Sequence, residues 1–268
     1  MLLTSRMTKC IVKNKNTFIV RAITIVITLV FDLIFYTQMG YTQKDGQNRI
    51  GALFFTMNAV SFSTIQFMIL SFNENTDQLI KELEGGLYRP MAHYLAVTIA
   101  NLPWNFAFVL ILVTPQFFIN NNNFEHWYNF ANWILINFAA FIVCESWGIF
   151  ISVLGGTKER AIAILAPITQ TLTTFAGFYI SDKDVPVGLL PFKFLSFFRY
   201  IFLAMIHNEF DGINDCKTVD NVNLCEYIEN YNAGWEVIYY VLMIFGITLV
   251  LKIISYIIFD ARMKKYYG

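Results

Sequence analysis

Six long apolar stretches, separated by short polar segments, dominate the hydrophobic pattern of this chain. A transmembrane helix needs about 20 predominantly apolar residues, because the hydrocarbon core of a bilayer is about 30 Å thick. Each stretch reaches that length, and they cover residues 18–39, 50–72, 91–119, 127–153, 160–181 and 235–259. The pattern therefore predicts an all-α, polytopic membrane protein with six transmembrane helices.

A seventh apolar run, residues 186–206, differs from the other six. It contains two prolines and two cations, which are Pro186, Pro191, Lys193 and Arg199. Such residues make a poor lipid-facing span. We expect this run to form a re-entrant helical hairpin that dips into the outer leaflet, inside an external loop of residues 182–232.

The distribution of basic residues predicts the orientation, because cytoplasmic loops are enriched in Lys and Arg. They gather before the first span, after the second and fourth spans, and in the tail of residues 260–268, whereas residues 120–126 have none. Both termini are therefore expected in the cytoplasm. Residues 1–16 are interpreted as an amphipathic helix on the membrane surface, with a disordered cationic leader as the alternative. The pattern suits the plasma membrane and internal vesicles equally.

Composition narrows the class of protein. The chain has 268 residues, is 56% hydrophobic and has a formal net charge of zero, so no basic surface indicates nucleic acid as a partner. It has no G-x-x-x-x-G-K-[ST] phosphate loop, so we expect no ATPase activity by that route. We also expect no metal site, and neither His93 nor His207 has the spacing of a known catalytic motif. A lipid-modifying enzyme that uses one of these histidines is a remaining alternative.

Polar residues within the spans are candidate ligand contacts, because burying them in lipid costs free energy. Asn58 shares one helical face with Phe55, Phe62 and Gln66, and Gln170 lies in a second polar stripe. Either stripe is a cavity wall for an amphipathic ligand, or it serves helix packing. Asp32 and Glu145 are either proton carriers or residues paired with a neighbour such as Arg21 or an amide.

The polar segment of residues 81–90 lies between the second and third spans. It is either a solvated loop, in which a helix stops at Gly85 and Gly86, or a coupling surface for a soluble partner.

Several segments together resemble the membrane domain of the G subfamily of ABC transporters, the White-type half-transporters. The matching segments follow the family's order and cover nearly the whole chain: Gln47 to Phe55, Glu82 to Arg89 with Tyr94 and Leu102-Pro103, Phe198-Arg199-Tyr200, and His207 to Gly212. The resemblance implies one membrane domain over residues 1–268, with an N-terminal connecting helix and a re-entrant element before the last span. It also implies a dimer with a substrate cavity on its two-fold axis.

The resemblance also implies roles for individual residues. The positions that match the family's cavity wall are Phe55, Asn58, Ala59, Phe62, Gln170 and Thr173. Phe178 and Tyr179 fall at the family's outer gate, where some drug exporters have two leucines. Cys216 and Cys225 resemble the cysteines that stabilise the external loop, and they pair either with each other or across the dimer.

Half-transporters of this family carry an ATPase domain before the membrane domain, and this chain shows no such sequence. We expect either a fragment of a longer protein or a membrane subunit that uses an ATPase in trans, with ATP and Mg bound there. The expected function is export of lipid-like or amphipathic small molecules, with Glu82 and Arg89 as coupling residues. Expected partners are the ATPase domain, a second half-transporter in a homo- or heterodimer, and membrane lipids. An ATPase-less channel or scaffold is the alternative.

Overall fold

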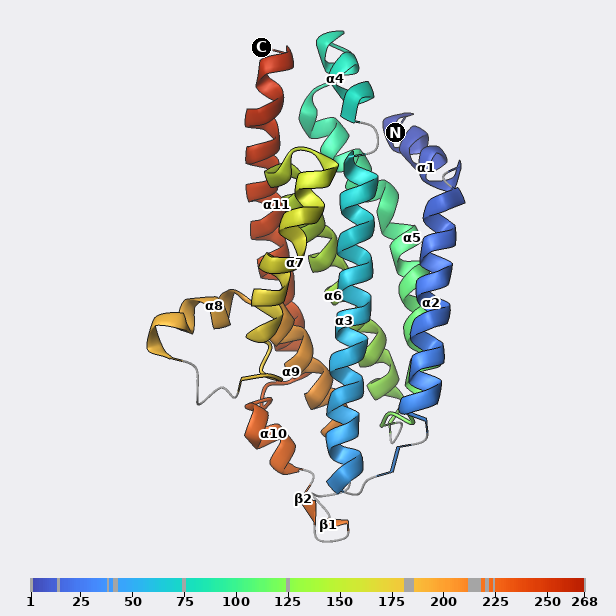
Figure 1. Ribbon diagram of the computed structural model, residues 1–268, viewed down its shortest axis with the longest axis vertical. Helices are drawn as coiled ribbons and strands as arrows, with labels where there is room; N and C mark the ends of the chain where they lie inside the picture. The colour runs from blue at the N-terminus through green and yellow to red at the C-terminus, as the bar shows by residue number, and fades with distance from the viewer. Residues whose placement is uncertain are drawn as a thin grey trace.

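Long helices run side by side along one axis in the computed structural model (Figure 1). The structure describes residues 2–13, 15–37, 39–40, 43–73, 76–123, 126–180, 186–211, 218–219, 222–223 and 225–267. The helices are α1 (Leu2–Lys13), α2 (Lys15–Phe35), α3 (Gln43–Asn73), α4 (Thr76–Glu84), α5 (Pro90–Ile119), α6 (Trp127–Gly155), α7 (Lys158–Thr174), the 3₁₀ helix η1 (Val187–Leu189), α8 (Leu190–Leu195), α9 (Phe197–Phe210), α10 (Cys225–Tyr231) and α11 (Val237–Tyr267). Strands β1 (Thr218–Val219) and β2 (Val222–Asn223) form a short antiparallel hairpin.

Both chain termini lie at one end of the bundle, beside α1 and α4, and the β hairpin lies at the other (Figure 1). We call these the terminal end and the hairpin end. Termini at the same end are what an even number of membrane crossings requires.

Four helices in the described part of the chain are long and apolar enough to cross a bilayer by themselves. They are residues Asp45–Asn73, Pro90–Ile119, Trp127–Gly155 and Val237–Lys264. These helices confirm a multi-pass integral membrane protein. The other two predicted spans correspond to α2, which has 21 residues, and α7, which has 17.

The prediction of one span over residues 160–181 is wrong at its carboxyl end. Helix α7 ends at Thr174, and Gly177 has a φ of 102°, a conformation that glycine adopts without steric cost and that cannot continue a right-handed helix. The first span also ends earlier than predicted, at Phe35 rather than residue 39.

The run expected to form a re-entrant helical hairpin contains the 3₁₀ helix η1 and the two short helices α8 and α9. Helix α8 has 6 residues and α9 has 14, so neither reaches the length of a span. Helix α8 projects from the side of the bundle, whereas α9 returns into it (Figure 1). Most side chains of α9 are buried, and the depth of this element in a bilayer stays a prediction.

Helix α6 is the centre of the bundle and packs against α3, α5, α7, α9 and α11. Its most apolar window is 72% buried within the protein, whereas that of α11 is only 22% buried. Helix α11 therefore presents most of its apolar surface outward, as a lipid-facing helix does.

A close approach of α3 and α6 depends on Gly148. A Cβ atom added there would lie 2.7 Å from the Cβ atom of Met68 and 3.0 Å from the carbonyl oxygen of Ile65. We therefore expect Gly148→Ala to destabilise the protein by about 1–3 kcal/mol, as overpacking of a core does. Thermal unfolding in detergent measures this effect. Gly246→Ala is the matched control, because a Cβ there meets no atom within 4 Å. Equal melting temperatures of the two variants would contradict the prediction.

A buried ion pair joins two distant segments near the hairpin end. Arg49 of α3 and Glu209 of α9 are 1% and 2% exposed, and their side chains are hydrogen-bonded to each other. The Arg49 guanidinium also donates to the carbonyl oxygens of Gly40 (2.9 Å), Asn121 (3.0 Å) and Met39 (2.6 Å). Glu209 in turn accepts from the backbone N–H of Asn123 at 3.1 Å. This network fixes α9 against the loops that join the spans.

Candidate functional site

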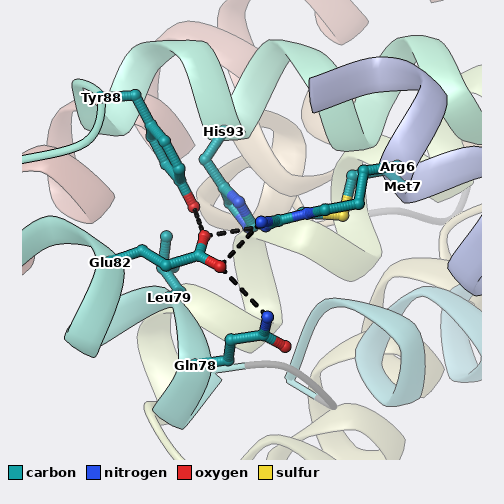
Figure 2. Close-up of a pocket in the computed structure, with 7 residues that line it drawn as sticks. All are labelled: Arg6, Met7, Gln78, Leu79, Glu82, Tyr88 and His93. Carbon is teal, nitrogen blue, oxygen red and sulfur yellow. Dashed lines mark hydrogen bonds and ion pairs between the residues drawn. The ribbon is translucent and has the colours of Figure 1, made fainter. Parts of the chain in front are cut away.

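Glu82 is the centre of a polar cluster at the terminal end (Figure 2). The Arg6 guanidinium of α1 donates to both of its carboxylate oxygens, at 2.7 and 2.8 Å. Gln78 donates to Oε1 at 3.1 Å, and the Tyr88 hydroxyl donates to Oε2. A bidentate guanidinium–carboxylate pair fixes both distance and orientation, so the cluster ties α1 to α4.

Local sequence explains how α4 presents Glu82 to α1. Leu79 and Leu83, four residues apart on one face, are buried, while Glu82 lies on the neighbouring face. The helix ends as expected at the two glycines, with Gly86 at a φ of 65°, and Pro90 then begins α5. The interpretation of this segment as a solvated loop fits residues 85–89 only, because residues 81–84 belong to α4.

Apolar packing holds the other side of the cluster. Met7 of α1 packs with Ala96, Val97 and Ala100 of α5, and this contact places Arg6 over α4. The cluster lines a small pocket to which His93 of α5 also contributes, and the His93 ring stacks parallel to the Tyr88 ring with centroids 6.3 Å apart.

The cluster shifts the pKa values of its members. The hydrogen bonds from Arg6 are the main reason that the pKa of Glu82 falls to about 2. The same bonds raise the pKa of Arg6. Burial, followed by the bond to Glu82, raises the pKa of Tyr88 to about 12. Glu82 and Arg6 therefore stay charged at any physiological pH.

The lowered pKa predicts how the cluster responds to acid. A carboxyl with a depressed folded-state pKa stabilises the fold fully above its ordinary pKa, here 4.5, and loses that contribution as the pH falls through about 2. The difference in melting temperature between the wild type and Glu82→Gln should therefore stay constant from neutral pH to about 4.5 and shrink below it. A difference that already vanishes near about pH 6 would contradict this pairing.

The two predicted coupling residues, Glu82 and Arg89, have different surroundings. Arg89 precedes α5, is exposed and makes no side-chain contact with the cluster among the described residues. Sequence reasoning missed Arg6 as the partner of Glu82. The only signal was that residues 1–16 and 81–90 were both expected on the cytoplasmic side.

The predicted cavity residues of α3 lie along one partly exposed stripe. Phe55, Asn58, Ala59 and Phe62 are each half-buried. Phe55 stacks on Phe31 of α2, with ring centroids 4.4 Å apart. Asn58 donates to the carbonyl oxygen of Phe54 within its own helix. The stripe is therefore a continuous surface whose polar group is satisfied locally.

The two cavity residues predicted on α7 point in different directions. Gln170 is exposed, whereas Thr173 is buried and donates to the carbonyl oxygen of Thr169. Thr169 accepts a hydrogen bond from the indole N–H of Trp147 in α6 at 3.2 Å. Thr173 thus belongs to the α6–α7 packing face, and only Gln170 is available to a ligand or a second copy.

The two predicted gate residues follow α7 and cover α3. The Phe178 ring stacks on Phe54 with centroids 4.2 Å apart, and the Tyr179 ring meets the same ring edge-on at 5.2 Å. Both are exposed on their other side. The predicted disulfide lies outside the described residues, because neither Cys216 nor the side chain of Cys225 is described.

Polar residues inside the bundle pair with amides. The Gln116 amide donates to Asp32 at 2.6 Å, and the Asn105 amide donates to Glu145 at 3.1 Å. Arg21 donates to Asn105 at 2.9 Å and lies 3.5 Å from the centroid of the Phe67 ring. The expected pairing with a neighbour is therefore observed for both carboxyl groups.

Comparison with known proteins identifies relatives. Residues 1–210 match the ABC-2 type transporter family of membrane proteins. The chain is 26% identical over 213 residues to ABC transporter G family member 1 of Dictyostelium discoideum, covering 76% of this chain and 27% of that protein. It is 24% identical over 280 residues to ABC transporter G family member 5 of Arabidopsis thaliana, covering 99% and 41%. It is 27% identical over 184 residues to the ABC transporter ATP-binding protein/permease wht-3 of Caenorhabditis elegans, covering 68% and 30%. The chain thus spans less than half the length of each of these relatives.

Proposed function

Since this chain belongs to the ABC-2 type transporter family, we propose that it is the membrane-spanning subunit of an ATP-driven exporter. Its relatives are G-family members of the White type, and transport across a membrane is the general function of that family. The proposed cargo is a lipid-like or amphipathic small molecule.

The observation that carries the proposal is the Arg6–Glu82 cluster at the terminal end. A soluble motor must transmit force to the membrane helices through a rigid surface, and the bidentate pair joins α1 and α4 into one unit. The neighbouring residues Lys81 and Arg89 are exposed and supply charges that a soluble partner can contact. The name of the C. elegans relative joins an ATP-binding protein with a permease, which supports such a partner.

The proposed mechanism is a shift between two states. An ATP-binding domain, in the same polypeptide or in trans, binds ATP and Mg and displaces α1 and α4 together. Helix α4 contacts α11, and α1 contacts α5, so the displacement reaches the membrane helices directly. The cargo leaves on the far side if it binds the outward-open state more weakly than the inward-open state.

We place the cargo between two half-transporters. The half-buried stripe of α3 and the exposed Gln170 of α7 form the proposed wall, and Phe178 and Tyr179 form the proposed gate. Helices α2 and α7 complete six crossings, both termini are cytoplasmic, and α8 and α9 form the re-entrant element. A homodimer and a heterodimer present this wall equally well.

The native complex tests this proposal. An antibody to the carboxyl-terminal residues should isolate an ATP-binding domain together with this chain, either in one polypeptide or as a bound partner. Isolation of the chain with no ATP-binding domain would favour the alternative, which is a channel or membrane scaffold that works without ATP.

A further inference from the structure

A polar cavity lies at the hairpin end, far from the coupling cluster, where α6, α9 and α11 meet. Its volume is about 330 Å³, and its polar lining includes Asn129, Asn132, His207, Asn208, Asp211 and Glu236. This volume is at the lower end of the range typical of small-molecule sites, about 300–1,000 Å³. None of the proposed coupling, cavity-wall or gate residues lines this cavity.

The cavity carries negative charge. Asp211 and Glu236 contribute carboxylates, and no lysine or arginine of the described residues lines the cavity. Asp211 lies 3.5 Å from Nε2 of His207, and Nδ1 of His207 lies 2.9 Å from the carbonyl oxygen of Ala233. Glu236 is exposed and has no ion-pair partner in the described part of the chain. The cavity therefore favours a cation.

One buried amide in the lining has a side-chain oxygen to which no described group donates a hydrogen bond. Asn208 is only 4% exposed, and its Nδ2 donates to the carbonyl oxygen of Asn129 at 3.0 Å. Its Oδ1 is buried and accepts no hydrogen bond from any residue that the structure describes. An unmade bond at a buried acceptor costs about 1–3 kcal/mol. A ligand that brings an N–H donor relieves that cost, so a cation that carries N–H groups fits better than one without them.

Aromatic residues place the cavity at the level of a membrane surface. Trp127 and Trp235 are 78% and 55% exposed, and Tyr239 is 55% exposed. They lie at the beginnings of α6 and α11, beside the cavity. Exposed Trp and Tyr residues are enriched where the hydrocarbon core meets the headgroups, so the cavity opens where phospholipid headgroups lie.

We propose that this cavity binds a primary ammonium group, supplied by the headgroup of an aminophospholipid. Asp211 and Glu236 neutralise the positive charge, and Oδ1 of Asn208 accepts an N–H bond. A quaternary ammonium has no N–H to donate, and an anionic headgroup is repelled by the carboxylates. A free soluble amine offers the same ammonium chemistry without the acyl chains.

Lipid titration of the purified full chain in detergent tests the proposal, with thermal unfolding and native mass spectrometry as readouts. Phosphatidylethanolamine should bind more tightly than phosphatidylcholine, and phosphatidylglycerol should bind weakest. The double variant Asp211→Asn with Glu236→Gln should weaken phosphatidylethanolamine binding by about fivefold or more, the effect of about 1 kcal/mol from partly exposed ion pairs. Both side chains are exposed, so the variant should fold normally, which its melting temperature without lipid will verify.

Glu229→Gln is the matched control, because Glu229 is also an exposed acid at the hairpin end and does not line the cavity. It should leave lipid binding unchanged. Competition by free ethanolamine distinguishes a lipid headgroup from a soluble amine as the source of the ammonium group. If ethanolamine binds much more weakly than phosphatidylethanolamine, the ligand is a lipid of the bilayer. If the two bind equally tightly, the ligand is a soluble amine. Phosphatidylglycerol binding as tight as phosphatidylethanolamine binding, or full binding by the double variant, would overturn the proposal.

Discussion

Replacing Glu209 with alanine will destabilise the protein by about 3–5 kcal/mol, because it leaves the buried Arg49 guanidinium without its counter-charge. Arg49 is 1% exposed, so water cannot replace the lost carboxylate. The same change also removes the acceptor for the backbone N–H of Asn123. Little folded protein should therefore reach the membrane, and thermal unfolding of the remainder in detergent should show a large decrease in melting temperature.

A double variant separates the cost of an unpaired buried charge from the cost of losing the whole ion pair. Arg49→Met with Glu209→Ala removes both charges and should recover part of the lost stability, as replacement of a whole buried pair often does. Recovery will be incomplete, because the carbonyl oxygens of Met39, Gly40 and Asn121 lose their donor. Glu229→Gln provides the control for loss of an exposed acid. Normal stability of Glu209→Ala would show that this pair does not hold the hairpin end together.

In the proposed exporter, reversing the charge of Glu82 will reduce ATP-driven transport by roughly tenfold or more while the chain stays folded. Glu82→Arg replaces a bidentate bond with repulsion between two cations, and hydrogen bonds to charged groups contribute about 1.5–3 kcal/mol each. Helices α1 and α4 would then no longer move as one unit. Transport rates at equal amounts of membrane-inserted protein measure this effect.

Two further variants show whether the loss of transport comes from breaking the Arg6–Glu82 pair. Glu84→Arg makes the same change of charge on the same helix, at an exposed position that is not part of the cluster, and should keep transport. Arg6→Glu combined with Glu82→Arg restores opposite charges and should recover part of the activity. Full transport by Glu82→Arg would refute the coupling role of Glu82.

Local signals in the sequence were sufficient for the long helices. Spans such as residues 127–153 were predicted because hydropathy over about 20 residues depends only on neighbours along the chain. The predicted end at residue 181 was wrong because α7 already ends at Thr174, and Gly177, with a φ of 102°, cannot continue a helix through the rest of the apolar run. The start of helix α4 was not predicted, because only three of its nine residues, Leu79, Ile80 and Leu83, are aliphatic.

The long-range contacts depend on pairs that no local pattern reveals. Arg6 and Glu82 are 76 positions apart, and Arg49 and Glu209 are 160 apart. The resemblance to a family drew attention to the segments that contain Glu82, Arg49 and Glu209, but not to their partners. Similarly, spacing alone placed Gln170 and Thr173 on one stripe, whereas Thr173 is buried and only Gln170 is exposed.

ATP dependence of flux tests the central claim most directly. Inside-out vesicles from cells that contain the chain and its native ATP-binding domain would be supplied with a fluorescent amphipathic lipid. We predict accumulation of the lipid with hydrolysable ATP, none with a non-hydrolysable analogue, and a loss of accumulation in Glu82→Arg but not in Glu84→Arg. Equal flux with and without ATP, following the concentration gradient, would contradict an ATP-driven exporter and identify a channel.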